Sequence, residues 1–378
     1  MSRRNDDRKD IVIVGGGWAG FILTRALSAK LDPAKYNLIL VTARRSFIHL
    51  IASARMVVTS EGKLENQAIF PYDGLFVNGN GTHVVGTVTA IDEVAPGKGG
   101  DVILTNDERI HYDVLALATG STWSGPLNFP QSDAEVIASI NDWRNKIANA
   151  KHVVVVGGGA VGIEIAGEIK DTYPKKKVTL VHSEKQLLND VYPDKWRQDI
   201  ERRVRKRNID LILGDRLDSF PEPGAVGVTT RNGKQLRDAD LIIPAFGARP
   251  NTAYLSSLDT TVLSEQGFVK VKPTLEVVNH PSVFALGDII DWPEQKQAAK
   301  TKAHADVVAA NIQSYLTGQP LSKVYKGSPE MIVVPLGKSG GSGYLGILWG
   351  VIVGDWLTKL LKGKTLMVPP VRKEFGLA

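Results

Sequence analysis

Residues 11–20 read Ile-Val-Ile-Val-Gly-Gly-Gly-Trp-Ala-Gly, and residues 153–162 read Val-Val-Val-Val-Gly-Gly-Gly-Ala-Val-Gly. Each is a β-branched strand that runs into G-x-G-x-x-G and then into a small-residue helical pattern, at 21–31 and 163–173. The first glycine makes the strand-to-helix turn, the second lets the backbone approach a pyrophosphate at the helix N-terminus, and the third lets the helix pack on the strand. The expected contacts are Gly15, Gly17, Gly20, Gly157, Gly159 and Gly162. Two such units predict a protein that binds two dinucleotides.

Three later strands end in short signatures that extend this pattern. They are an apolar run ending in Thr119-Gly120, a second ending in Gly247, and a third ending in Gly287-Asp288. The order of these motifs resembles the two-dinucleotide flavoprotein oxidoreductases. The resemblance implies an α/β fold with two Rossmann-like domains, the first binding FAD and the second NAD(P)H. It also implies that the aspartate holds the ribityl chain of FAD and that the glycine before it lets the flavin ring lie against the backbone.

The same resemblance sets the expected domains. The FAD-binding domain is expected to be discontinuous, with residues 1–122 and 248–325, around an NAD(P)H-binding domain at 123–247. Residues 326–378 are expected to form a small C-terminal domain that faces a membrane and a quinone. The length of 378 residues suits two to three domains of about 100 to 200 residues each.

The chain contains no cysteine. Many two-dinucleotide flavoproteins pass electrons from the flavin to a disulfide, and that reaction requires thiolates. The composition therefore excludes a disulfide reductase, an iron–sulfur cluster on this polypeptide and a Cys-ligated zinc site. The seven histidines are scattered without metal-binding spacing, so we expect no metal. Electrons must leave the flavin for an acceptor that is not part of the chain.

Three further stretches carry a closer resemblance, and the last two of them are more particular than the glycine motifs. They are residues 46–49 (Ser-Phe-Ile-His), residues 178–183 (Val-Thr-Leu-Val-His-Ser) and the run from Lys296-x-Ala298 to His304-Ala305. Through them the chain resembles the apoptosis-inducing-factor-like flavoproteins, and among these the ferroptosis suppressor proteins, over nearly its whole length. The resemblance implies hydride transfer from NADH or NADPH to FAD, and then reduction of a ubiquinone- or vitamin K-type membrane quinone to an antioxidant quinol. It leaves open the nucleotide preference, the physiological acceptor and any modification of the flavin.

Three catalytic residues are implied by the resemblance. Glu164 would face the nicotinamide and the flavin, and a carboxylate is unusual where a helix packs on a buried sheet, although the helix dipole would also favour an acid there. Lys296 lies where related quinone reductases place the quinone pocket. Lys362 matches a C-terminal lysine used near the flavin, with an ordinary solvated lysine as the alternative. Any of the three could supply a proton for the quinol. His49 could also reach this region, but a lone histidine is more often structural.

The first dinucleotide unit departs from the usual pattern at the ribose position. The strand at 38–41 is followed by Thr42, where an Asp or Glu usually binds the adenosine ribose. A threonine offers one hydrogen bond where a carboxylate accepts two. The affinity for FAD could then be lower, or the ribose could be held by Arg44 or Arg45, and Arg55 is a further candidate residue at the FAD site.

The second unit also lacks an acid at the matching position. His182 stands there, followed by Ser183, and Lys185 is close in sequence. An acid would repel the 2′-phosphate of NADPH and select NADH. Its absence leaves both nucleotides open, and we expect the use of both.

An apolar run at 344–357 reads Tyr-Leu-Gly-Ile-Leu-Trp-Gly-Val-Ile-Val-Gly-Asp-Trp-Leu. It is shorter than the roughly 20 residues of a membrane-spanning helix, but it suits an interfacial segment with two tryptophans at headgroup level. Residues 359–378 carry five basic side chains and one acidic one, a net charge of +4, which is favourable beside anionic lipid. The alternative is that the run forms the core or dimer face of a small domain.

The N-terminal sequence also bears on location. The chain begins Met1-Ser2, without the glycine that N-myristoylation requires, so we expect membrane attachment through the C-terminal segment. The charged residues before the first strand fit neither a secretory signal nor a mitochondrial presequence. The expected location is cytoplasmic, peripherally on the cytosolic face of a membrane such as the lipid droplet, the plasma membrane or the mitochondrial outer membrane.

Two other functions stay open. The net charge is +6, and relatives of apoptosis-inducing factor have been associated with nucleic acid. The densest basic stretch, 195–207, reads as a helix with Trp196, Ile200 and Val204 facing inward, so a solvated helix face explains it better and we do not expect a nucleic-acid partner. A ferredoxin or rubredoxin reductase would share the fold and would expose a basic docking patch. The oligomeric state, including a homodimer, is also open.

Overall fold

The first fingerprint lies at the centre of a largely parallel sheet. The computed structural model describes residues 7–221, 224–347 and 349–377. The strand order is β18-β19-β9-β1-β2-β5, and only the β18–β19 pair is antiparallel. The bounds are β1 (Lys9–Val14), β2 (Tyr36–Thr42), β5 (Thr82–Val85), β9 (Val114–Leu117), β18 (Glu276–Val277) and β19 (His280–Ala285). Val14 pairs with Val41 and Leu117, so three strand ends meet where the glycine motif begins.

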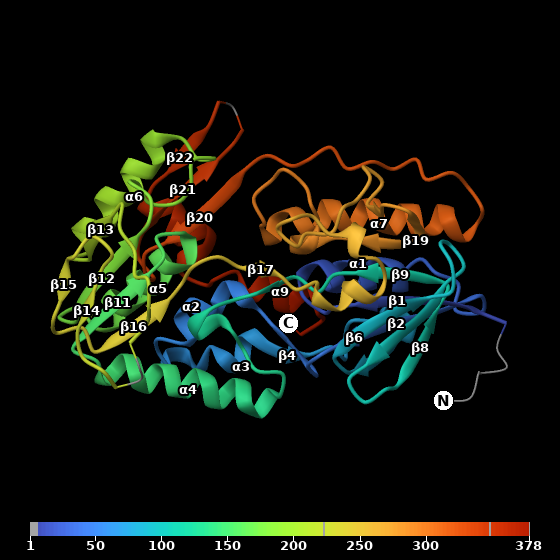
Figure 1. The fold of residues 1–378 in the computed structure, drawn as a ribbon, viewed down its shortest axis with the longest axis horizontal. Coiled ribbons are helices and arrows are strands. Elements are labelled where there is room, and N and C mark those ends of the chain that lie inside the picture. The colour runs from blue at the N-terminus through green and yellow to red at the C-terminus, as the bar shows by residue number, and fades with distance from the viewer. Residues whose placement is uncertain (1–6, 222–223, 348, 378) are drawn as a thin grey trace.

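Different layers cover the two faces of this sheet. Helices α1 (Trp18–Ser28) and α7 (Thr301–Leu316) pack against each other on one face (Figure 1). The antiparallel strands β6 (Val88–Glu93), β7 (Gly100–Leu104) and β8 (Arg109–Tyr112) lie on the other. One continuous hydrophobic core joins the sheet to both layers.

The second fingerprint begins a parallel sheet with the order β13-β12-β11-β16. Its strands are β11 (His152–Val156), β12 (Lys177–His182), β13 (Asp210–Leu213) and β16 (Leu241–Pro244). The helices that pack on it are α4 (Asp133–Asn149), α5 (Ala160–Thr172) and α6 (Asp194–Lys206). Because side chains alternate along a strand, Val154 and Val156 face the opposite side, where the hairpin β14 (Val228–Thr229) and β15 (Gln235–Leu236) packs.

Two short crossings join these lobes. Strand β10 (Ser121–Thr122) leads out of the first lobe, β17 (Arg249–Pro250) leads back into it, and the two pair antiparallel. Figure 1 shows them side by side between the lobes. This arrangement confirms the predicted α/β fold with two dinucleotide-binding units.

A segment from the first part of the chain packs on the second lobe. It contains α2 (Ser53–Met56) and α3 (Glu65–Ala68), between the paired strands β3 (Ser46–Ile48) and β4 (Ile69–Pro71). Its apolar side chains belong to the same core as the second sheet. The segment therefore bridges the lobes, although it falls within the range 1–122 expected for the FAD-binding domain.

The C-terminal segment contacts both lobes. Its elements are β20 (Met331–Pro335), β21 (Gly341–Leu345), β22 (Val351–Val353), α8 (Asp355–Thr358), the π-helical turn η9 (Lys359–Gly363) and α9 (Val368–Glu374). Val334 and Leu366 lie in the core of the second lobe, whereas Val371 and Phe375 lie in that of the first. The Phe375 ring stacks on Phe21 of α1, with ring centres 3.8 Å apart.

Candidate functional site

In each G-x-G-x-x-G motif the protein's own packing requires the first and the last glycine. A Cβ at Gly15 would lie 2.3 Å from the carbonyl oxygen of Ala118, and one at Gly20 would lie 1.8 Å from the carbonyl oxygen of Gly15. Gly157 and Gly162 repeat this arrangement, with distances of 2.4 and 1.8 Å. These contacts hold strand, turn and helix together and leave no room for a side chain.

The middle glycines, Gly17 and Gly159, face open space instead. A Cβ at either would meet no protein atom within 4 Å. Each is the N-cap of its helix, in an extended conformation open to any residue, with no side-chain cap and no acid in the first turn. Neither packing nor backbone conformation requires glycine there, whereas a pyrophosphate lying against the backbone does. The residues at both sites therefore fit a dinucleotide.

The Gly-Asp strand end lies against the first fingerprint. Gly287 has a φ of +79°, and a Cβ on it would lie 2.8 Å from the Cβ of Ala19. The Ser121 hydroxyl lies 3.4 Å from Oδ2 of Asp288, and burial raises the pKa of Asp288. The Thr119 hydroxyl donates to the carbonyl oxygen of Asn251 at 2.6 Å. Thr119, Gly120, Gly287 and Asp288 thus gather at the carboxyl end of the first sheet.

Thr42 and Arg44 are occupied by protein partners. Thr42 is 4 % exposed, and its hydroxyl donates to the Arg44 carbonyl oxygen at 2.5 Å and bonds Nε2 of His83 at 2.7 Å. The Arg44 guanidinium donates to the carbonyl oxygens of Pro130 and Phe129, at 2.5 and 2.6 Å. Burial lowers the pKa of Arg44. In this arrangement the two side chains fix the start of the crossing into the second lobe.

His182 supports the second fingerprint. The Gly158 amide donates to its Nδ1 at 3.1 Å, and its Nε2 bonds the Leu188 carbonyl oxygen at 3.2 Å. Burial lowers the pKa of His182, so the ring is neutral near pH 7. Lys185 is exposed at the edge of this site, and Gly247, at the end of β16, faces open space.

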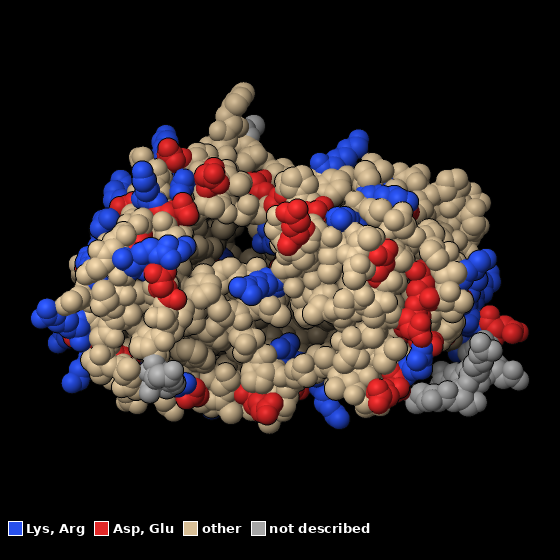
Figure 2. Space-filling model, viewed as in Figure 1, with Lys and Arg blue, Asp and Glu red and all other residues tan. Residues whose placement is uncertain are grey.

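Glu164 and Lys362 meet, although 198 positions separate them. The Lys362 ammonium donates to Oε1 of Glu164 at 2.6 Å and to the Val333 carbonyl oxygen at 3.3 Å. Glu164 is 8 % exposed, and burial raises its pKa while the charge of Lys362 opposes the rise. The face in Figure 2 is hollowed where the lobes meet. The pair is a buried carboxylate and a cation, and together they can hold a proton.

Arg55 and Glu168 form a second buried pair. Nε and Nη2 of Arg55 donate to the two oxygens of Glu168, at 2.9 and 2.8 Å. Nη2 also donates to the Gly363 carbonyl oxygen at 2.7 Å, and Nη1 donates to that of Lys364 at 3.3 Å. Most N–H groups of Arg55 are therefore engaged by protein atoms. The local sequence gives no sign of this pair, because its members are 113 positions apart.

His49 is fully buried and holds the same part of the C-terminal segment. Its Nε2 bonds the Leu366 carbonyl oxygen at 2.8 Å, and its ring lies edge-to-face with Trp18. Burial lowers the pKa of His49 to about 4. These contacts favour a structural role for this histidine.

Lys296 lies beside a separate cavity. Its ammonium donates to the carbonyl oxygens of Ile290 and Trp292, at 2.7 and 3.1 Å, and stands 5.0 Å over the Phe268 ring. Burial lowers the pKa of Lys296. The cavity has a volume of about 570 Å³ and draws its lining from both lobes and the C-terminal segment. It is lined by Val191, Phe268, Asp291, Trp292, Pro293, Glu294, Gln295, Lys296 and Glu330.

A buried network behind this cavity escaped the sequence analysis. The Gly287 amide donates to Nδ1 of His304 at 3.2 Å, and Nε2 of His304 bonds Oε1 of Glu294 at 2.9 Å. The other oxygen of Glu294 accepts from the Tyr325 hydroxyl at 2.7 Å. In the sequence, only the His304-Ala305 dipeptide pointed to this site. The residues that contact His304 do not form a recognisable motif with it.

The basic helix α6 is largely paired within the protein. Asp199 accepts from Arg202 and Arg203, and Glu201 accepts from Arg205 at 2.8 Å. With Asp355 on Arg203 and Asp171 on Arg207, four acids offset four of the seven basic charges at 195–207 that suggested a nucleic-acid surface.

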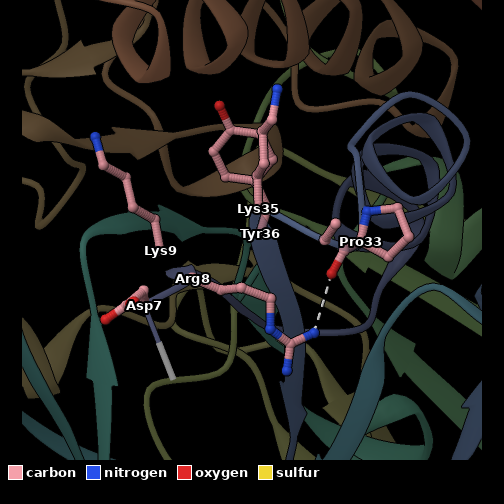
Figure 3. A pocket seen from close by; sticks show the side chains of 7 residues that line it. Asp7, Arg8, Lys9, Pro33, Lys35 and Tyr36 are labelled. Atoms are coloured by element: carbon pink, nitrogen blue, oxygen red, sulfur yellow. Dashed lines mark hydrogen bonds between the residues drawn. The ribbon is translucent and has the colours of Figure 1, made fainter. Parts of the chain in front are cut away.

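Figure 3 shows a second cavity, of about 680 Å³, at the amino ends of β1 and β2. Arg8 donates to the Pro33 carbonyl oxygen there at 3.1 Å. Ligands of parallel sheets bind at the carboxyl ends of the strands, so this cavity lies at the wrong end for a nucleotide.

The C-terminal segment exposes large apolar side chains. Trp349 and Trp356 are 101 % and 75 % exposed. We use "C-terminal apolar surface" for Ile347, Trp349, Val351, Trp356, Leu360 and Leu361. The predicted interfacial run 344–357 is divided between a β-hairpin and α8, and the hairpin tip projects without charge at the top of Figure 2. Among the described residues, no helix is long and apolar enough to cross a bilayer.

The chain is similar to flavoproteins over most of its length. The family described as pyridine nucleotide-disulphide oxidoreductase matches residues 9–303. An FAD-dependent oxidoreductase, FVFD30, of Flammulina velutipes is 50% identical over 85% of this chain and 99% of that protein. Apoptosis-inducing factor homolog B of Dictyostelium discoideum is 30% identical, covering 96% and 95%. Ferroptosis suppressor protein 1 of Mus musculus is 29% identical, covering 95% and 93%.

A solved structure extends the similarity of fold. The sulfide:quinone oxidoreductase of Aquifex aeolicus superimposes with a TM-score of 0.79 at 18% identity, covering 97% of this chain and 92% of that one.

Proposed function

The chain belongs to the pyridine nucleotide-disulphide oxidoreductase family and, within it, to the apoptosis-inducing-factor-like flavoproteins, and from this we propose that it reduces a membrane quinone with electrons from NADH or NADPH. Its cofactors are FAD and NAD(P)H. The proposed net reaction consumes NAD(P)H, one proton and a quinone, and yields NAD(P)⁺ and the quinol. The observation that carries the proposal is a fold with two dinucleotide sites in a chain without cysteine. Because the reduced flavin cannot pass its electrons to a disulfide of the same chain, the acceptor must be a separate molecule.

The nicotinamide side of the reaction is assigned to Glu164 and Lys362. When bound, FAD supplies the redox chemistry by accepting hydride from NAD(P)H and giving two electrons to the acceptor. Glu164 stands one turn into the helix whose N-terminus takes the NAD(P)H pyrophosphate. The Lys362 ammonium holds its carboxylate in place and adds positive charge beside the site. The pair also excludes water from this end of the cleft, since both side chains are largely buried.

The acceptor side is assigned to the cavity beside Lys296. Its walls combine aromatic rings, Phe268 and Trp292, with the half-buried ammonium group of Lys296. Such a mixture suits a quinone head, which has a flat ring to stack and oxygens that accept hydrogen bonds. The lowered pKa of Lys296 makes it a better proton donor at neutral pH than a solvated lysine.

The C-terminal apolar surface is assigned to a lipid membrane. Exposed tryptophans and leucines carried by one small segment are typical of a surface that rests in the headgroup region. Apart from Lys362, which is paired with Glu164, residues 359–378 bring four basic side chains and one acidic one to the same segment, a net charge of +3 that favours anionic lipid. A surface of this kind would let a long-chain quinone pass from the bilayer to the enzyme, in line with a peripheral location on a cytosolic membrane face.

An anaerobic titration tests the proposal. NADH or NADPH should bleach the visible flavin band of the purified holoprotein, and a short-chain ubiquinone analogue should restore it in one turnover. If the band bleaches but recovers only with a ferredoxin-type protein, the quinone assignment is wrong. If the protein carries no flavin after reconstitution with FAD, the whole function is wrong.

A further inference from the structure

Arg55 joins three parts of the chain that are distant in sequence. It lies on α2, it pairs with Glu168 on α5, and it donates to the carbonyl oxygens of Gly363 and Lys364 at the end of η9. The Arg55 and Glu168 side chains are 6% and 3% exposed. A buried bidentate arginine with two further carbonyl partners fixes position in several directions at once.

The residues that Arg55 contacts lie next to both members of the proposed catalytic pair, Glu164 and Lys362. Glu168 follows Glu164 by one helical turn, so the two carboxylates lie on the same face of α5. Gly363 and Lys364 directly follow Lys362. Arg55 therefore holds the helix that carries Glu164 and the turn that carries Lys362 in a fixed relation.

The turn held by Arg55 does not keep its shape by local preference. Leu366 and Met367, just beyond it, have φ values of +52° and +59°, which are uncommon for residues with side chains. The bond from His49 to Leu366 and those from Arg55 to Gly363 and Lys364 supply the outside constraint that such a turn needs.

Stability alone is a weak explanation for the Arg55–Glu168 pair. Replacing a buried ion pair with apolar side chains is often neutral or stabilising, because desolvation offsets much of the attraction. Both lobes already contact the C-terminal segment through apolar side chains. Charged groups at this junction are better explained if they fix the position of α5 relative to the turn at 362–364.

We propose that Arg55 and Glu168 are positioning residues that keep the Lys362 ammonium on Glu164. The proposal rests on the proposed function, in which that pair faces the nicotinamide. Arg55 then acts through Lys362 rather than by contact with a cofactor, which differs from the role at the FAD site expected for it. Without Arg55 the turn at 362–364 loses its partners on α2, and the ammonium is no longer held against the carboxylate.

The charges around Glu164 give this proposal its own pH signature. Glu164 faces Lys362 from η9, Glu168 from its own helix and Arg55 from α2. Lys362 and Arg55 lower its pKa against the rise caused by burial, and Glu168 raises it. Displacing Lys362 therefore raises the pKa of Glu164, so the acid limb of the pH profile moves to higher pH.

The test compares Arg55→Met/Glu168→Met with wild type as holoproteins. The double variant leaves no unpaired buried charge, so it should fold and retain FAD. We expect the rate of flavin bleaching by NADH in stopped flow to fall by about 10- to 100-fold, since misplacement of about 1 Å can cost this much. The acid limb of its pH profile should move to higher pH, because the effect of Lys362 on the pKa of Glu164 is larger than those of Glu168 and Arg55. Adding Lys362→Met should slow the double variant little further, because both changes act on the same ammonium.

A matched control exists one helix away. Arg144 pairs with Glu65 at 2.6 Å and donates to the Met56 carbonyl oxygen at 2.7 Å, so it also ties the α2 segment to the second lobe. Within the described part of the chain its hydrogen-bond partners are Met56, Glu65 and Asn141, and none of them belongs to residues 362–366. The variant Arg144→Met/Glu65→Met should keep the wild-type bleaching rate and pH profile.

Several outcomes overturn the inference. A double variant with the wild-type bleaching rate and pH profile would do so, as would a loss of rate fully additive with Lys362→Met. If the double variant does not fold, Arg55→Lys decides, because lysine keeps the charge but lacks the fork; a wild-type pH profile for that variant refutes the proposal. Failure of the proposed function looks different, since wild type itself would then not be bleached by NAD(P)H.

Discussion

The substitution Gly159→Ala should weaken nucleotide binding without destabilising the fold. A Cβ at Gly159 meets no protein atom within 4 Å, and the backbone there, with φ −75° and ψ 179°, suits any residue. Alanine is a poorer N-cap than glycine, but it lowers the entropy of the unfolded chain, and each effect is below about 1 kcal/mol. The free energy of unfolding should therefore stay within about 1 kcal/mol of wild type.

Nucleotide binding should respond strongly to the same methyl group. It occupies the space where the pyrophosphate of NAD(P)H approaches the N-terminus of α5. Loss of one charge-assisted hydrogen bond costs about 1.5–3 kcal/mol, which weakens binding about 10- to 150-fold. The FAD content should stay unchanged, because FAD occupies the other unit.

The assay is titration of the FAD-loaded protein with NAD⁺, alongside thermal unfolding. Gly162→Ala serves as the contrast, because its Cβ would lie 1.8 Å from the Gly157 carbonyl oxygen and should destabilise the lobe by several kcal/mol. Wild-type affinity in Gly159→Ala, or instability like that of Gly162→Ala, would refute the reasoning.

Three further predictions concern the other parts of the structure. Lys362→Met should slow flavin bleaching by NADH about 10- to 100-fold and raise the pH of its acid limb, as measured by stopped flow; an unchanged rate removes Lys362 from the mechanism. Trp349→Ala/Trp356→Ala should abolish co-flotation with anionic lipid vesicles while turnover of a soluble quinone analogue persists; co-flotation equal to wild type would contradict the membrane assignment. His49 has a folded-state pKa of about 4 against an ordinary 6.5, so the unfolded chain binds the extra proton between these values. The free energy of unfolding should therefore be unaffected by His49 above about pH 6.5 and should decrease as the pH falls toward 4, by up to about 3 kcal/mol. Unfolding measured at a series of pH values should show this decrease in wild type and not in His49→Gln.

Local patterns were sufficient to predict the two dinucleotide units. The β-branched runs became β1 and β11, and the helices α1 and α5 begin within the glycine motifs. These features depend on neighbours within a few residues, which periodicity and turn chemistry describe well. The strand ending in Gly287 was also predicted, and it lies against α1.

Contacts between distant segments were harder to predict. The resemblance suggested Glu164 and Lys362 separately, but no spacing indicates that they touch across 198 positions. The pair of Arg55 and Glu168 was missed for the same reason. Thr42 was a candidate for a contact with the ribose, and its hydroxyl has two protein partners that sequence alone does not reveal.

The apolar run at 344–357 was predicted as one interfacial segment, and it is divided. Gly350 has a φ of +93° in the turn of the hairpin, and Gly354 is the N-cap of α8. Glycines at both points break a continuous element, so the exposed tryptophans come from a hairpin and a short helix. The apolar composition of the run predicted an exposed apolar segment, but it did not predict how the backbone of that segment folds.

The stacking of Phe375 on Phe21 has a consequence for biosynthesis. Phe21 belongs to the helix that follows the first glycine motif, and Phe47 and Phe70 also contact the late ring. While the ribosome is still translating the chain, this aromatic cluster lacks one of its members. The first lobe thus completes its interior only after residue 375 has emerged, so flavin is expected to be acquired after that point rather than by a shorter nascent chain.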